Sequence, residues 1–109
     1  CILVVNNLRD IATDRKAGKT TLGVVMGDRG TRRWFGILLL AAWAAMAASL
    51  LAEAPFGAAA LGAGIPLGIL VYRPIHRGTS GRDLNPVLKA TARYHLVLGL
   101  LWAGALAAS

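Results

Sequence analysis

The sequence predicts an all-α protein built as a bundle of transmembrane helices, and three observations lead to this prediction. Hydrophobic residues make up 56% of the 109 residues, and with 13 glycines the share reaches roughly two-thirds, against about 45–50% in soluble domains. Lys, Arg, Asp and Glu are absent from two stretches of 19 residues, 34–52 and 54–72. The net charge of +7 lies outside these stretches. Such apolarity excludes a disordered tail, and the single Cys1 excludes an internal disulfide.

The sequence predicts the end of one helix and three further membrane spans. The apolar opening, residues 1–9, has the character of the last turns of a helix that begins earlier, so we expect the chain to be the C-terminal part of a longer protein. Residues 34–52 and 54–72 are each long enough to cross the roughly 30 Å hydrocarbon core of a bilayer, at about 1.5 Å of rise per residue. Residues 94–109 form a third expected span after Arg93. All 109 residues are assigned to one transmembrane domain.

Two soluble alternatives are weaker. A buried helical hairpin would need more chain than 109 residues to surround it. A signal peptide does not fit either, because the apolar stretches are internal and too long.

The basic residues flank the expected spans and predict their orientation. The segment up to Arg33 holds seven Lys or Arg against three Asp, and residues 73–93 hold five against Asp83 alone. By the positive-inside rule both segments are cytoplasmic, and the turn Glu53-Ala54-Pro55 lies on the far side. We therefore expect a multi-pass protein of the cell (inner) membrane whose partner is the lipid bilayer, with no nucleic acid needed to explain its charge.

The chemistry-bearing residues lie in one segment, 6–19. On a helix Asn6, Asp10 and Asp14 share one face, because they are four residues apart. Two neighbouring carboxylates at a membrane boundary are costly, and Mg²⁺, which takes one or two carboxylates together with phosphate oxygens, relieves the cost. Bases that suit a phosphate group follow directly: Arg15, Lys16 and Lys19. The pattern predicts a clamp for a diphosphate.

Simpler explanations exist for the same residues. The two aspartates could merely pair with Arg9, Arg15 and Lys16 on a solvated helix end, because a pair spaced in this way is common. A P-loop is excluded, because Thr13 occupies the position of its first glycine. An EF-hand lacks its later Gly and Glu.

The run NNLRDIATDRKAGKTTLGVVMGDR closely resembles the second aspartate motif of the UbiA superfamily of intramembrane prenyltransferases, in the form typical of its menaquinone-pathway branch. Residues 83–92 are similar to the segment that enters the last helix of that family. The resemblance covers the whole chain, as roughly the last third of a family member. It departs at Gly23, Val25 and Met26, where the family usually has Ala, often a basic residue, and Leu.

The resemblance implies about nine transmembrane helices around a central cavity, with two facing aspartate motifs of which this chain has the second. It implies that Asp10 and Asp14 bind Mg²⁺ and are the catalytic pair. It also implies residues that contact the diphosphate: Asn6, Arg9, Arg15 and Lys19.

The implied reaction transfers a polyprenyl group from polyprenyl diphosphate to 1,4-dihydroxy-2-naphthoate, with loss of CO₂ and diphosphate, giving demethylmenaquinone. Two alternatives stay open: a related enzyme with another aromatic acceptor, such as 4-hydroxybenzoate or homogentisate, and a non-enzymatic membrane subunit. The 109 residues alone are expected to be inactive, because half of the implied metal site is missing. Asn85 and Pro86 are most simply a helix entry, with Asn85 near the N-cap.

Overall fold

The computed structural model describes the backbone of residues 1–53 and 57–108, and these residues form four α-helices. They are α1 (Ile2–Lys16), α2 (Leu22–Glu53), α3 (Gly57–His76) and α4 (Asn85–Ala107), with a 3-10 turn η1 (Gly81–Leu84) before α4. The described ranges contain no strand, which confirms the prediction of an all-helical chain. The predicted turn Glu53-Ala54-Pro55 lies, apart from the backbone of Glu53, outside the described residues.

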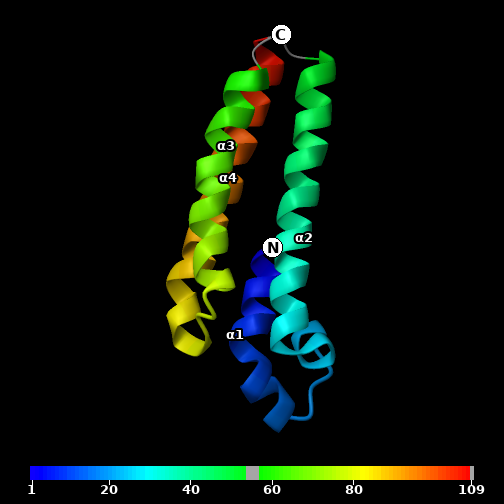
Figure 1. The fold of residues 1–109 in the computed structure, drawn as a ribbon, viewed down its shortest axis with the longest axis vertical. Helices are drawn as coiled ribbons and strands as arrows, with labels where there is room; N and C mark the ends of the chain where they lie inside the picture. Colours follow the sequence, from blue (N-terminus) through cyan, green and yellow to red (C-terminus); the bar gives the residue numbers. More distant parts are fainter. Residues whose placement is uncertain (54–56, 109) are drawn as a thin grey trace.

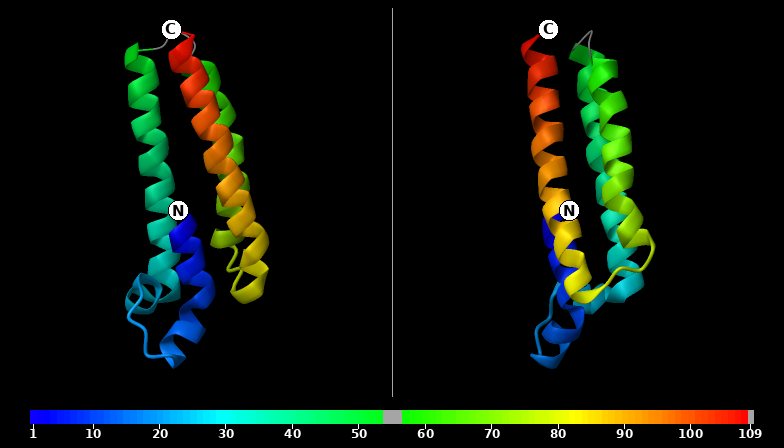
Figure 2. Two further views of the ribbon diagram at one scale, coloured as in Figure 1. Left: turned by 180° about the vertical axis from the view of Figure 1, so that it is seen from behind. Right: turned by 90° about the vertical axis from the view of Figure 1, so that its left-hand side faces the viewer.

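The bundle is elongated, with principal extents of 51 × 21 × 19 Å. Helices α2, α3 and α4 run along its long axis, and the short α1 packs at one end against α2 and α4 (Figures 1 and 2). The segment between α1 and α2 and the segment between α3 and α4 lie at this same end (Figure 1). The fold therefore places the two basic segments together, as the predicted topology requires.

The helices extend beyond the uncharged stretches. Helix α2 begins at Leu22, well before residue 34, and α1 continues to Lys16, so the whole of residues 6–16 is helical. Among the described residues, one helical segment, Leu22–Ala52, is long and apolar enough to cross a membrane by length and composition. The further expected spans remain predictions.

Helix α2 is broken near its start by Gly27, whose φ of 68° and ψ of 178° are not helical. A side chain at this position would be strained, because this backbone region is open almost only to glycine. Asp28 and Thr31 follow the break, and Thr31 Oγ1 donates a hydrogen bond to the Gly27 carbonyl at 2.7 Å. After Gly27 the helix runs through residues 28–33, four of which are charged, into the uncharged stretch that begins at Trp34.

The core runs between the helices and is formed by large apolar side chains, among them Phe35, Leu50, Ile75 and Leu84. Helices α3 and α4 approach closely at Gly64 and Gly68. A Cβ at Gly64 would lie 2.9 Å from Leu98 Cδ1, so the Leu98 side chain would have to move to admit a larger residue there. Small residues at such positions are typical of helix packing in membranes.

The end of α3 is tied to α2. Gly78, with φ of 90°, donates its N–H to the Ile75 carbonyl, and Thr79 donates to Pro74. The Ile75 carbonyl also accepts a hydrogen bond from Arg32 Nη1 at 2.7 Å. These bonds satisfy carbonyl groups that the end of a helix leaves free.

Candidate functional site

The expected site lies on α1 from Asn6 onward and on the turn that ends this helix. Gly18 has φ of 69°; its N–H bonds the Arg15 carbonyl at 3.2 Å, and the Lys19 N–H bonds the Asp14 carbonyl at 2.9 Å. This pair of bonds is the Schellman arrangement, in which a left-handed glycine stops a helix. Gly18-Lys19 is thus a helix stop, which agrees with the exclusion of a P-loop.

The stop turns Lys19 back toward the aspartates. Lys19 Nζ lies 3.6 Å from Asp14 Oδ1, and the Asp14 side chain is 12% exposed. Among the described residues, Lys19 is the side chain that the structure pairs with Asp14. A carboxylate this buried with a single distant ion pair has oxygen lone pairs left for a cation or a hydrogen-bond donor.

Asp10, one turn earlier, is held by its neighbour Arg9. Arg9 Nε donates to Oδ1 at 2.7 Å and Arg9 Nη2 donates to Oδ2 at 2.8 Å, a two-pronged pair. These hydrogen bonds hold the pKa of Asp10 below its ordinary value, because they favour the charged carboxylate. Asp10 is thus kept ionised, the form that binds a cation.

Asn85, which the sequence analysis assigned only to a helix entry, contacts the pair of Arg9 and Asp10 through Arg9. Asn85 is the first residue of α4, whose N-cap is Leu84, and Pro86 lies in the first turn. Asn85 Oδ1 accepts a hydrogen bond from Arg9 Nη1 at 3.0 Å. No spacing in the sequence could have revealed this contact, because 76 positions separate the two residues.

The other expected site residues are placed less tightly. Asn6 is half-buried on α1, and Arg15 is exposed near its end. The structure describes no side-chain hydrogen bond or ion pair for either of them. The simpler explanation by local ion pairs holds for Asp10 with Arg9, whereas Asp14 pairs with Lys19 instead of Arg15 or Lys16.

Close packing against α2 fixes the position of α1. A Cβ built at Gly23 would lie 2.7 Å from the Asn7 carbonyl oxygen and 3.0 Å from Ile11 Cγ1. The two backbones therefore nearly touch beside the aspartate motif. Gly23 is one of the departures from the family's usual run, and here it gives α1 room to approach.

The donor set fits half of a magnesium site. Asp10 and Asp14 are hard oxygen donors on adjacent turns of α1, and Mg²⁺ is usually bound by one or two carboxylates together with substrate phosphates. The described residues contain no group of three or more His, Cys, Asp or Glu side chains that could enclose a metal. A cation bound here would need further ligands from a phosphate group or from outside these residues.

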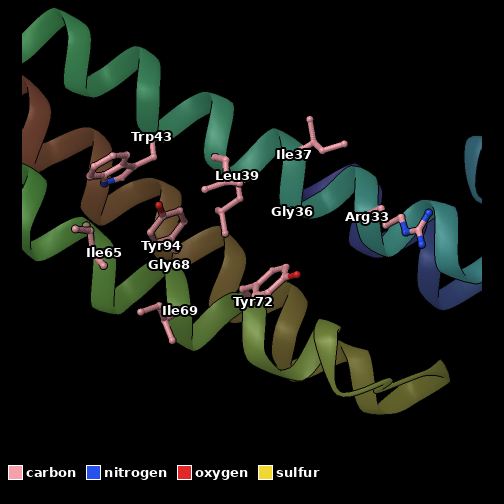
Figure 3. Close-up of a pocket in the computed structure, with 12 residues that line it drawn as sticks. Arg33, Gly36, Ile37, Leu39, Trp43, Ile65, Gly68, Ile69, Tyr72 and Tyr94 are labelled. Atoms are coloured by element: carbon pink, nitrogen blue, oxygen red, sulfur yellow. The ribbon is translucent and has the colours of Figure 1, made fainter.

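A separate apolar groove of about 650 Å³ runs between α2, α3 and α4 (Figure 3). Its lining includes Leu39, Ile65 and Ile69, with Arg33 toward one end and Trp43 toward the other. Trp43 Nε1 is buried without a hydrogen-bond partner among the described residues. In a membrane protein such a surface is covered by lipid or by another helix.

Comparison with known proteins agrees with the resemblance found in the sequence. The UbiA prenyltransferase family matches residues 1–97. The chain is 43% identical over 106 residues, 97% of its length, to 1,4-dihydroxy-2-naphthoate octaprenyltransferase of Mycobacterium tuberculosis (strain ATCC 25618 / H37Rv). It is 40% identical over 105 residues, 96% of its length, to the protein of the same name from Mycobacterium leprae (strain TN).

A more distant relative carries the same name. It comes from Escherichia coli (strain K12) and is 33% identical across an alignment of 109 positions that covers 93% of this chain. The matched parts are 36%, 35% and 33% of the three relatives, so the chain spans about a third of their length. No solved structure matches the chain significantly.

Proposed function

Because the chain belongs to the UbiA prenyltransferase family, we propose that its protein transfers a polyprenyl group from polyprenyl diphosphate to 1,4-dihydroxy-2-naphthoate in menaquinone biosynthesis. The observation that carries the proposal is the identity of 40–43% over nearly the whole chain to relatives named for this acceptor. Family membership and the apolar segment Leu22–Ala52 indicate a membrane protein. The multi-pass arrangement with cytoplasmic basic loops belongs to the proposal.

The aspartate pair gives the proposal its chemistry. Asp10 and Asp14 would hold Mg²⁺, and Asn6 would complete this face of α1. When bound, Mg²⁺ supplies a Lewis acid that stabilises negative charge on a leaving phosphate group. Lys19 lies beside Asp14 and Arg15 is exposed one residue after it, so both can neutralise the diphosphate.

The proposed reaction balances without a further reagent. The allylic C–O bond of the donor breaks, and its electron pair leaves with the diphosphate. The electron-rich naphthalene ring forms the new C–C bond with the allylic carbon, and the ring carboxylate leaves as CO₂. The product is demethylmenaquinone in its reduced, quinol form. Exclusion of water by a membrane cavity protects the allylic cation from hydrolysis.

The test uses the full-length protein in nanodiscs, supplied with polyprenyl diphosphate, Mg²⁺ and 1,4-dihydroxy-2-naphthoate. We expect prenylated product and released CO₂, and losses of at least about 10²-fold in Asp10→Asn and Asp14→Asn, the size expected when a group that stabilises charge in the transition state is removed. The matched control is Asp83→Asn, which changes an exposed aspartate of η1 outside the motif and should keep the activity.

Each part of the proposal has its own contradicting result. Wild-type turnover in both motif variants would disprove the role of the aspartate pair. Preferred turnover of 4-hydroxybenzoate or homogentisate in competition would assign another acceptor. Absence of any prenyl transfer by the full-length protein would favour a non-enzymatic membrane subunit.

A further inference from the structure

Asn85 is placed to serve the aspartate motif, although it lies at the start of another helix. It is the first helical residue of α4, one position after the N-cap Leu84, so its side chain does not serve as the cap of this helix. Instead its Oδ1 accepts the hydrogen bond from Arg9 Nη1 at 3.0 Å. The side chain is thus turned toward α1.

Arg9 connects Asn85 with the motif. Its Nε and Nη2 face the two oxygens of Asp10, while Nη1 faces Asn85. Because the guanidinium is a rigid plane, fixing one edge also fixes the edge that holds the carboxylate. An ionised carboxylate has about four lone-pair sites, and the two bonds from Arg9 leave sites on both Asp10 oxygens for a cation.

We propose that Asn85 is a positioning residue for Asp10, acting through Arg9 and setting the orientation in which the carboxylate meets the metal. The proposal rests on the proposed function, because it takes Asp10 as a metal ligand. Packing supports it: α1 contacts both η1 and α4, so the entry of α4 and the motif are held together as one unit. Asn85 itself is exposed, so replacing it opens no cavity in the core.

The test measures metal binding instead of turnover. Mn²⁺, used as the probe, is titrated into the full-length protein in nanodiscs with inorganic diphosphate present, and the free Mn²⁺ is read by electron paramagnetic resonance. We expect Asn85→Leu to weaken Mn²⁺ binding on the order of tenfold, the lower range for residues that orient metal ligands. Asn85→Asp keeps an acceptor oxygen and should bind within about twofold of the wild type.

Two further variants separate positioning from general damage. Asp83→Leu introduces the same side chain at an exposed position two residues earlier, in η1, and should leave Mn²⁺ binding unchanged. In an Arg9→Met background, Asn85→Leu should cause no additional loss, because Asn85 is proposed to act only through Arg9.

Each outcome decides the inference. Equal Mn²⁺ binding by the wild type and Asn85→Leu would overturn it, as would equal weakening by Asp83→Leu or an undiminished effect in the Arg9→Met background. A wild-type protein that binds no Mn²⁺ would disprove the metal site and this inference together. The expected binding pattern in a protein without prenyl transfer would disprove the proposed function and leave the positioning role standing.

Discussion

Arg32 joins α2 to the end of α3, and replacing it tests how much this contact stabilises the fold. The side chain is 13% exposed. Nη1 donates to the Ile75 carbonyl at 2.7 Å, while Nε and Nη2 donate to Asp28 at 2.7 and 2.8 Å. The substitution Arg32→Met keeps most of the apolar stem and removes all three bonds.

The expected loss of stability follows from these contacts. A hydrogen bond from a charged donor to a carbonyl contributes about 1.5–3 kcal/mol. The Asp28 side chain is 57% exposed, and an ion pair this accessible to water contributes only about 0–1 kcal/mol. We therefore expect Arg32→Met to lower the free energy of unfolding by about 2–3 kcal/mol, and Asp28→Asn to lower it by about 1 kcal/mol or less.

The assay is thermal unfolding of the full-length protein in detergent micelles, followed by tryptophan fluorescence. Arg29→Met is the matched control, because it removes the same charge from an exposed position of the same helix. We expect the loss of stability to be smallest in Arg29→Met, larger in Asp28→Asn and largest in Arg32→Met. Equal free energies of unfolding for Arg32→Met and Arg29→Met would refute this expectation. Equal loss in Asp28→Asn and Arg32→Met would assign the stability to the ion pair instead of the Ile75 carbonyl.

Two further predictions concern single residues and use the same unfolding assay. Phe35 is 0% exposed, so Phe35→Ala should lower the free energy of unfolding by about 3–5 kcal/mol through the cavity it leaves. The control Ile37→Ala, at a 54% exposed position of α2, should lower it far less. Similar losses in the two variants would contradict the assigned core. Gly18→Ala should cost about 1–2 kcal/mol because an L side chain is strained at φ of 69°. The control Gly99→Ala lies in α4 with nothing within 4 Å of the added Cβ and should gain up to about 1 kcal/mol. A neutral Gly18→Ala would show that the helix stop does not depend on the left-handed glycine.

The helices could be predicted from the sequence, but their ends could not. An uncharged stretch such as 34–52 reports where the chain is apolar, and helix formation does not stop at the first charge. Residues 28–33 include four charged side chains and are still helical, and the pair of Asp28 with Arg32 one turn later favours the helix there. The start of α2 therefore lies well before the predicted stretch, and the break at Gly27 has no counterpart in the apolar pattern.

Part of the candidate site could also be predicted from the sequence, and part could not. The spacing of Asn6, Asp10 and Asp14 predicts one helix face, because helical periodicity is a local property of the chain, and α1 is helical through all three residues. Lys19 was expected beside the motif as well, and the glycine stop places it against Asp14. The metal and the diphosphate contacts stay predictions.

By itself the sequence determined the all-helical class, the common end of the two basic segments and the helix that carries the aspartates, because each depends on composition or on spacing within a few turns. Only the tertiary structure decided which partner each charge takes. Arg9 meets Asn85 across 76 positions, and Arg32 reaches the Ile75 carbonyl across 43. Such contacts are set by how closely the helices pack, at Gly23 and Gly64 among other places, and that distance is a property of the folded bundle that no local pattern encodes.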